Sequence, residues 1–226
     1  MRKKLSIILF ILIISIFTVA CSNKKEKDNS NVLVTLVLDK GGVNDESFNQ
    51  LAWEGAKKAS IEYGIKIKYL ESNTDADYKS NLEQAVDLDS NLIIAVGFNL
   101  SEALKEAAIY YPKSSFAIID GSFDKIPENV TNINFDEGEA GYLAGLASAK
   151  TLDGNKFGFI GGISVPAVEN YKEGFEKGLL EVNPNIELSV QYANSFSDAA
   201  KGKAIATQMY NNDINCIMSA GGGVNN

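Results

Sequence analysis

Residues 34–55 carry the sequence VTLVLDKGGVNDESFNQLAWEG, which joins an apolar run to a segment of helical periodicity through a polar loop. The apolar run is typical of a buried strand, and the two glycines of the loop allow backbone angles that other residues avoid. Apolar or small residues recur at helical spacing from Phe48 to Tyr63, and Ser47 with Gln50 forms a capping-box pattern. The stretch therefore predicts a strand, a flexible loop and a helix in succession.

The polar loop is expected to contribute to a binding site. In open α/β sheets, ligands bind at the carboxyl ends of the strands, which is where this loop lies. Asn44, Asp45 and Asn49 supply hydrogen-bond donors and acceptors, and Phe48 supplies a flat apolar face. This combination suits a planar polar heterocycle. The same pattern is typical of a helix cap formed by Asp45 or Ser47 beside a phenylalanine that fills the core.

The run from Gly42 to Gln50, followed by Trp53-Glu54-Gly55, resembles the signature of the basic membrane protein family. Members of this family are bacterial lipoproteins that serve as nucleoside-binding components of ABC importers. The resemblance implies a two-lobed α/β fold of the periplasmic-binding-protein type (type I), with parallel sheets and helices on both faces. It also implies a ligand site in the cleft between the lobes, without a cofactor and without catalysis.

The N-terminus has the pattern of a lipoprotein signal peptide over residues 1–20, with basic residues, a short apolar run and Ala20 before Cys21. The apolar run is too short for a comfortable transmembrane helix. Cys21 is expected to be acylated, as with palmitate, and to hold the mature protein at the extracytoplasmic face of the cell membrane. The alternatives are an uncleaved anchor helix and an ordinary signal with an incidental cysteine. Residues 21–31 are polar and are expected to form a flexible tether.

Alternating strands and helices over residues 32–134 predict an N-terminal α/β lobe with near-continuous apolar strands. Strands are expected over 32–38, 65–70, 92–96, 115–119 and 129–135, and helices over 48–63, 77–89 and 101–111, the last capped by Ser101. Phe98 and Asp120 each follow directly on a strand, so both should lie at the same sheet edge as Asp45. In the family, the aspartate that matches Asp120 contributes to ligand binding. The alternatives are a turn-forming Asp-Gly and plain packing of Phe98.

Residues 135–154 are expected to form a crossover helix and hinge, because residues 132–145 resemble the family segment that passes between lobes. A partial second α/β lobe should follow over 155–226, with strands over 156–160, 186–192 and 214–219 and helices over 168–180 and 197–210, the latter capped by Ser197. In the family, an aromatic residue and a Gly-Gly pair at the end of the last of these strands contact the ligand. Met218 stands in place of the aromatic residue, and Gly222 matches the pair. The family's second lobe continues beyond the position of Asn226, which implies an incomplete lobe here.

Composition excludes several classes of function. The chain has no histidine, which excludes a Ser-His-Asp triad and a metal held by histidines. The formal net charge of −8 gives no general attraction to nucleic acid. Cys216 lies in an apolar strand and is expected to be a small buried side chain, so no disulfide and no metal site are expected.

The leading hypothesis is a lipid-anchored substrate-binding protein that captures a nucleoside, a purine one, and delivers it to the permease and ATPase of an ABC importer. Phe48 would stack on the base, and Asn44, Asp45 and Asp120 would bind its edge. A surface antigen or regulatory lipoprotein without a transport role is one alternative. An α/β enzyme that processes nucleosides, with Asp45 or Asp120 as a base, is the other.

Overall fold

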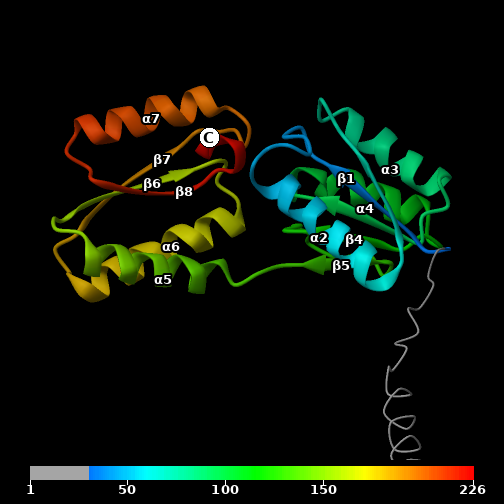
Figure 1. Cartoon of the computed structure of the whole chain (residues 1–226), viewed down its shortest axis with the longest axis horizontal. Coiled ribbons are helices and arrows are strands. Elements are labelled where there is room, and N and C mark those ends of the chain that lie inside the picture. The colour runs from blue at the N-terminus through cyan, green and yellow to red at the C-terminus, as the bar shows by residue number, and fades with distance from the viewer. Residues whose placement is uncertain (1–30) are drawn as a thin grey trace, which may run out of the picture.

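The computed structural model describes residues 31–226, so the predicted signal peptide, Cys21 and nearly all of the predicted tether lie outside the described residues. Within this range the chain forms two parallel sheets, each with helices on both faces (Figure 1). The predicted α/β class with parallel sheets is therefore confirmed. No helix in residues 31–226 combines the length and the apolar character that crossing a membrane requires.

The first sheet has the strand order β2-β1-β3-β4-β5, and every neighbouring pair is parallel. Its strands, with the helices that connect them, are β1 (Leu33–Leu38), α2 (Phe48–Tyr63), β2 (Lys66–Leu70), α3 (Asp77–Asp87), β3 (Leu92–Val96), α4 (Ser101–Tyr110), β4 (Phe116–Ile119) and β5 (Val130–Ile133). A 3-10 turn, Phe98–Leu100, lies between β3 and α4. Because all five strands run the same way, the loops that follow them open at one edge of the sheet.

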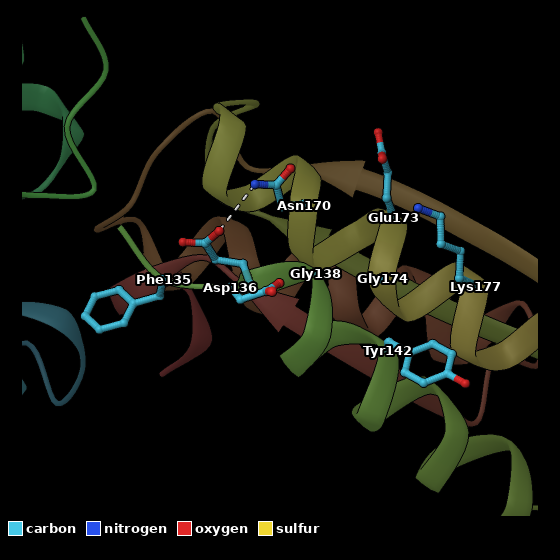
Figure 2. Close-up of a pocket in the computed structure, with 9 residues that line it drawn as sticks. Phe135, Asp136, Gly138, Tyr142, Asn170, Glu173, Gly174 and Lys177 are labelled. Carbon is cyan, nitrogen blue, oxygen red and sulfur yellow. Dashed lines mark hydrogen bonds between the residues drawn. The ribbon is translucent and has the colours of Figure 1, made fainter. Parts of the chain in front are cut away.

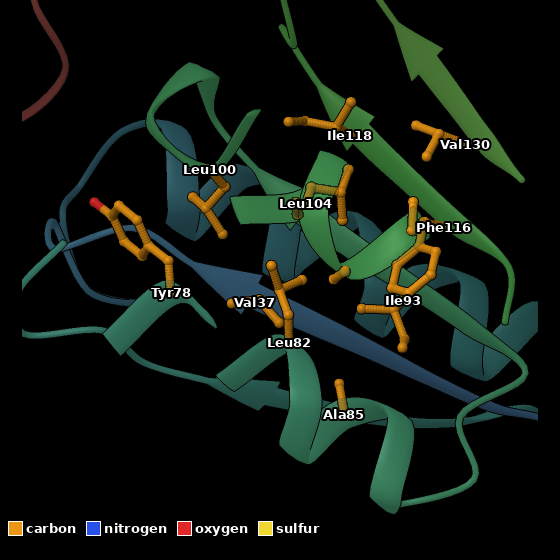
Figure 3. Close-up of a cluster of buried hydrophobic side chains, with 13 residues drawn as sticks. Val37, Tyr78, Leu82, Ala85, Ile93, Leu100, Leu104, Phe116, Ile118 and Val130 are labelled. Carbon is orange, nitrogen blue, oxygen red and sulfur yellow. The ribbon is translucent and has the colours of Figure 1, made fainter. Parts of the chain in front are cut away.

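Apolar side chains on the two faces of this sheet form two separate cores. On one face, α3 and α4 place Leu82 and Leu104 against Val37, Ile93 and other strand residues (Figure 3). On the other face, α2 covers a cluster of strand residues that includes the buried Leu36 and Leu38. Burying each large aliphatic side chain stabilises the fold by about 1.5–3 kcal/mol. The sheet stabilised in this way fixes the positions of its loops.

The second sheet has the strand order β7-β6-β8 and is also parallel. Its elements are α5 (Glu137–Thr151), β6 (Lys156–Gly161), α6 (Pro166–Val182), β7 (Glu187–Tyr192), α7 (Ala199–Asn211), β8 (Cys216–Ala220) and a 3-10 turn (Gly222–Asn225). Phe175 and Leu179 of α6 pack on one face, and Ile205 and Met209 of α7 pack on the other. Figure 1 shows α7 on one side of this sheet and α6 with α5 on the opposite side.

Four glycines let α5 and α6 approach each other closely. Gly141 and Gly145 of α5 face α6, and Gly174 and Gly178 of α6 face α5. A Cβ atom built on any of the four would lie 2.1–2.3 Å from a backbone oxygen of the opposite helix. The small residues of the predicted crossover helix therefore serve this helix contact, which anchors α5, the first element after the first lobe, to the second lobe.

The predicted serine caps are wrong at all three helices. Ser47 makes no side-chain hydrogen bond at the start of α2, and Ser101 accepts from Ser122 N instead of capping α4. At α7 the capping side chain belongs to Asp198, which accepts from Lys201 N at 2.9 Å, and not to Ser197. In α2 and α7 a nearby aspartate takes the cap because its charged carboxylate is the stronger acceptor for N–H groups at a helix start.

Candidate ligand site between the two lobes

A cavity of about 770 Å³ lies between the two lobes, at the carboxyl edges of both sheets. Its volume falls within the range of small-molecule sites. The first lobe contributes Asp39, Gly41, Asp45, Ser47, Phe48, Gly97, Phe98, Asn99, Asp120, Gly121, Ser122, Phe123, Asn132, Asn134 and Phe135. The second lobe contributes Glu137, Val165, Pro166, Ala167, Val168, Asn170, Tyr171, Phe196, Ser219, Ala220, Gly221, Gly222 and Asn225. The cavity thus joins loops that are far apart in the sequence.

The loop after β1 is held by the carboxylate of Asp45. Oδ1 of Asp45 accepts hydrogen bonds from Ser47 N at 2.9 Å and Gln50 N at 3.0 Å, and Oδ2 accepts from Asn49 N at 2.9 Å. These bonds satisfy backbone donors that the start of α2 leaves without a helical partner. Asp45 therefore caps the helix, and it also lines the cavity.

We expect Asp45→Ala to lower the free energy of unfolding by about 2 kcal/mol, because three backbone N–H groups lose their acceptor. Urea unfolding of the full chain measures this change. The matched control is Asp198→Ala, which removes an acceptor for one backbone N–H of α7, so we expect a loss of about 1 kcal/mol. An Asp45→Ala protein as stable as the wild type would contradict the capping role.

Asp39 directly follows β1 and lies at the centre of a second polar cluster. Its Oδ1 accepts from Asn49 Nδ2 at 2.7 Å and from Gly41 N at 3.0 Å, and its Oδ2 accepts from Asn99 Nδ2 at 3.4 Å. Asn49 is only 1% exposed and is not among the residues that line the cavity. The structure thus places Asn49 behind the site, where it holds Asp39 in position.

Phe48 and Phe98 both line the cavity from the first lobe. The ring of Phe48 lies beside Gly97, which has a φ of +103°. Glycine adopts this angle without strain, and other residues do not. Phe98 also packs against the apolar core of the second lobe. Phe48 therefore contributes an aromatic ring to the cavity wall, and Phe98 forms part of the contact between the lobes.

Asp120 follows β4 in a left-handed backbone conformation, with a φ of 56°. Asn132 fixes the turn, since its Oδ1 accepts from Gly121 N at 3.1 Å and its Nδ2 donates to Gly121 O at 2.9 Å. Oδ1 of Asp120 is buried and has no hydrogen-bond partner among the described residues. Burial, and secondarily the charge of Glu137, raises the pKa of Asp120 to about 6. The side chain is thus an unsatisfied polar group at the cavity.

The second lobe presents polar and aromatic groups to the same cavity. Glu137, at the start of α5, is 6% exposed, and its Oε2 accepts from Asn170 Nδ2 of α6 at 3.3 Å. Tyr171 lies close by, and burial, followed by the charges of Glu137 and Asp120, raises the pKa of its hydroxyl. Phe196, from the loop after β7, adds an aromatic ring on this side.

A second hollow, of about 490 Å³, lies over α5 and α6 (Figure 2). It shares Phe135, Glu137 and Asn170 with the cavity between the lobes. The rest of its lining comes from polar residues and glycines of the two helices, namely Asp136, Gly138, Tyr142, Glu173, Gly174 and Lys177. Its aromatic residues are Phe135, which it shares with the larger cavity, and Tyr142. The larger cavity joins Phe48, Phe98 and Phe196 with polar groups of both lobes and is the better candidate for a ligand site.

The structure brings together five of the eight residues that the sequence singles out for ligand binding. The cavity is lined by Asp45, Phe48, Phe98, Asp120 and Gly222. Asn44 is exposed outside the lining, Asn49 is buried behind it, and Met218 packs into the core of the second lobe. Met218 lies inside β8, where it pairs with Phe159, so its side chain joins the core and not the loop beyond the strand.

Sequence reasoning missed several residues of the cavity, among them Asp39, Asn99, Glu137, Tyr171 and Phe196. Asp39 carries the same signal as Asp120, because it too directly follows an apolar strand. Asn99 stands next to Phe98 beyond the end of β3, so it carries this signal too. Glu137, Tyr171 and Phe196 have no such signal, since they reach the cavity only through the placement of one lobe against the other.

Metal-ligating groups are not gathered at this site. Among residues 31–226, no group of three or more histidine, cysteine, aspartate or glutamate side chains is arranged to hold a metal ion. Cys216 is a free, partly buried thiol in β8, on the side of the second-lobe core.

Comparison with known proteins gives matches over the described range. Residues 32–226 match the family model of the PnrA-like ABC transporter substrate-binding proteins. The ABC transporter nucleoside-binding protein BmpA of Lactococcus lactis is 40% identical over 207 residues, which cover 90% of this chain and 59% of that protein. The CD4+ T-cell-stimulating antigen of Listeria innocua is 40% identical over 206 residues, covering 89% and 57%.

The fold also matches solved structures of binding proteins. A solute-binding protein of an ABC transporter system from Aeropyrum pernix superposes with a TM-score of 0.77 at 28% identity, covering 84% of this chain and 55% of that one. The chain thus spans a little over half the length of the relatives that it matches. The family consists of substrate-binding proteins and not of enzymes. This chain belongs to the family of PnrA-like ABC transporter substrate-binding proteins, in which the basic membrane proteins are also found.

Proposed function

We propose that this protein binds a purine nucleoside in the cavity between its lobes and delivers it to the permease and ATPase of an ABC importer. The observation that carries the proposal is the meeting of an aromatic ring with carboxylate and amide groups in one cavity of about 770 Å³. A ribonucleoside pairs a flat base with a polar sugar, and it therefore needs both kinds of contact. The nucleoside-binding relative from Lactococcus supports the same ligand class.

In the proposed complex, Phe48 stacks on one face of the base, and Phe196 offers a second ring from the other lobe. Asp120 accepts a hydrogen bond from the edge of the base, and Asn44 reaches the ligand if the loop after β1 moves on binding. Gly222 has a φ of 59°, and a Cβ atom there would lie 3.0 Å from Phe196 O, so glycine lets the chain turn at the cavity wall. The remaining amides, such as Asn99 and Asn134, are within the lining and suit the sugar.

The proposal includes a lipid on Cys21, which would hold the two lobes at the extracytoplasmic face of the membrane. One chain would then release its ligand to a permease in the same membrane. Closing the cleft excludes water from the ligand, and opening it releases the ligand, so capture and release need only a relative movement of the lobes. No chemical step on the nucleoside is required.

We expect the full chain to retain a purine nucleoside unchanged and in a one-to-one ratio, and Phe48→Leu to weaken the affinity about tenfold. The reason is that an aromatic contact contributes about 0.5–1.5 kcal/mol beyond the area that it buries. Calorimetric titration with inosine and guanosine measures both quantities. Mass spectrometry of the recovered ligand shows whether it is unaltered.

The matched control is Tyr110→Leu, because Tyr110 is 77% exposed on α4 and is not part of the cavity lining. This variant should bind as tightly as the wild type. Absence of binding in the wild type would overturn the proposed function. Conversion of the nucleoside to a product would instead favour the enzyme alternative.

A further inference from the structure

The cavity wall contains a pair of carboxyl groups, one from each lobe. Asp120 belongs to the loop after β4 of the first lobe, and Glu137 begins α5 of the second. Both line the cavity, and they are close enough for the charge of Glu137 to act on the Asp120 carboxyl. The pair is therefore a feature of the joined lobes and is absent from either lobe alone.

The surroundings of the pair disfavour two negative charges. Oδ1 of Asp120 is buried without a partner, and Glu137 is 6% exposed with one amide donor, Asn170, at 3.3 Å. The other titratable groups that line the cavity are Asp39 and Asp45 from the loop after β1 and Tyr171 from α6. The lining contains no lysine or arginine to balance these acids. Like charges in a poorly solvated site favour the retention of a proton.

We propose that Asp120 holds a proton in the empty cleft and that a ligand with a ring N–H displaces this proton when it binds to Asp120. This inference rests on the proposed function, since the ligand is taken to be a nucleoside. The N–H of the base donates to the free oxygen of Asp120, and the proton that Asp120 held passes to solvent. The unpartnered oxygen then gains the hydrogen bond that it lacks.

The pair therefore makes the affinity depend on pH in a way that reports the chemistry of the base. A base with a ring N–H, as in inosine, needs the carboxylate, so its affinity rises as the pH increases through the pKa of Asp120. A base with a bare ring nitrogen at that position, as in purine riboside, accepts a hydrogen bond and prefers the protonated carboxyl. At neutral pH the pair thus selects ring donors over ring acceptors.

The test is a calorimetric titration of the full chain with inosine and with purine riboside over a range of pH. With a pKa of about 6 for Asp120, the affinity for inosine should rise about tenfold between about pH 5 and about pH 7. The affinity for purine riboside should not rise over this interval. Titration of inosine in two buffers with different ionisation enthalpies should show a proton released on binding.

Two variants assign the effect to the pair. Glu137→Gln removes the neighbouring charge, so the rise in inosine affinity should move to lower pH, while the amide can still pair with Asn170. Asp120→Asn cannot hold a carboxyl proton, and the rise should disappear. Glu139→Gln is the matched control, because Glu139 is exposed on the same turn of α5 and lies outside the cavity lining. Its profile should coincide with that of the wild type.

The outcomes separate this inference from the proposed function. Inosine binding that is tight and independent of pH would overturn the proposed proton on Asp120 and leave the nucleoside site standing. A profile of Glu137→Gln that coincides with that of the wild type would remove Glu137 from the pair. Failure to bind any nucleoside at any pH would overturn both proposals.

Discussion

Gly145→Ala is expected to lower the free energy of unfolding by about 3 kcal/mol, because the added methyl group has no space between α5 and α6. A Cβ atom at Gly145 would lie 2.3 Å from Phe175 O and 2.9 Å from Leu179 N. Both of these contacts are backbone atoms, so no side chain can turn away to relieve them. The helices must separate, and α6 would then withdraw Phe175 and Leu179 from the core of the second lobe.

The matched control for this prediction is Gly55→Ala on α2. Gly55 is an exposed helical glycine, and a Cβ atom there would meet nothing within 4 Å. Alanine should raise the stability by about 0.5–1 kcal/mol, because glycine loses more conformational entropy in a helix. Urea unfolding of the two variants should therefore give changes of opposite sign. A Gly145→Ala protein with wild-type stability would mean that the two helices are not in backbone contact.

The sheets were predictable because their strands are continuous apolar runs in the sequence. Runs such as Leu92–Val96 and Phe116–Ile119 are apolar throughout, as buried parallel strands must be, and Gly64 ends α2 in the left-handed conformation that its position suggests. The helix caps were less predictable. Serine and aspartate stand near each other before α2 and α7. The carboxylate is the stronger acceptor, but the geometry of the loop decides whether it reaches the backbone N–H groups.

The site was predictable where it depends on topology and unpredictable where it depends on the meeting of the lobes. Asp120 and Phe98 lie at the cavity because parallel strands end at a common edge. Met218 was singled out from the family pattern, yet it lies within β8 and packs into the core. Glu137 and Phe196 were missed because their local sequence does not indicate that they face the opposite lobe.

We expect Asp120→Asn to make the protein more stable at neutral pH and at the same time to weaken the binding of inosine at least about tenfold. Asparagine tolerates the left-handed conformation of this position, with its φ of 56°, so the backbone is preserved. The folded-state pKa of Asp120 is about 6, above the ordinary value of 3.8. The folded protein therefore binds more protons between these values, and this group destabilises it progressively as the pH rises through them.

Because the amide carries no charge, the stabilising effect of Asp120→Asn should be present at about pH 7.5 and nearly absent at about pH 4. Its expected size is about 2 kcal/mol, after allowance for partial screening by solvent. Urea unfolding at both values measures it. Asp213→Asn is the control, because Asp213 also has a positive φ, of 62°, but is exposed, so we expect a change within about 0.5 kcal/mol.

The combination of higher stability with weaker binding is what distinguishes a ligand-binding carboxylate from a structural one. A structural aspartate is satisfied by its neighbours, so its replacement destabilises the fold. An aspartate that binds a ligand leaves an acceptor unpaired in the empty protein. This unpaired acceptor lowers the stability of the fold until the ligand binds. If Asp120→Asn lowered the stability at neutral pH and left inosine binding intact, Asp120 would be a turn residue. The hydrogen-bond acceptor for the ligand would then be another carboxylate of the cavity lining, such as Asp39.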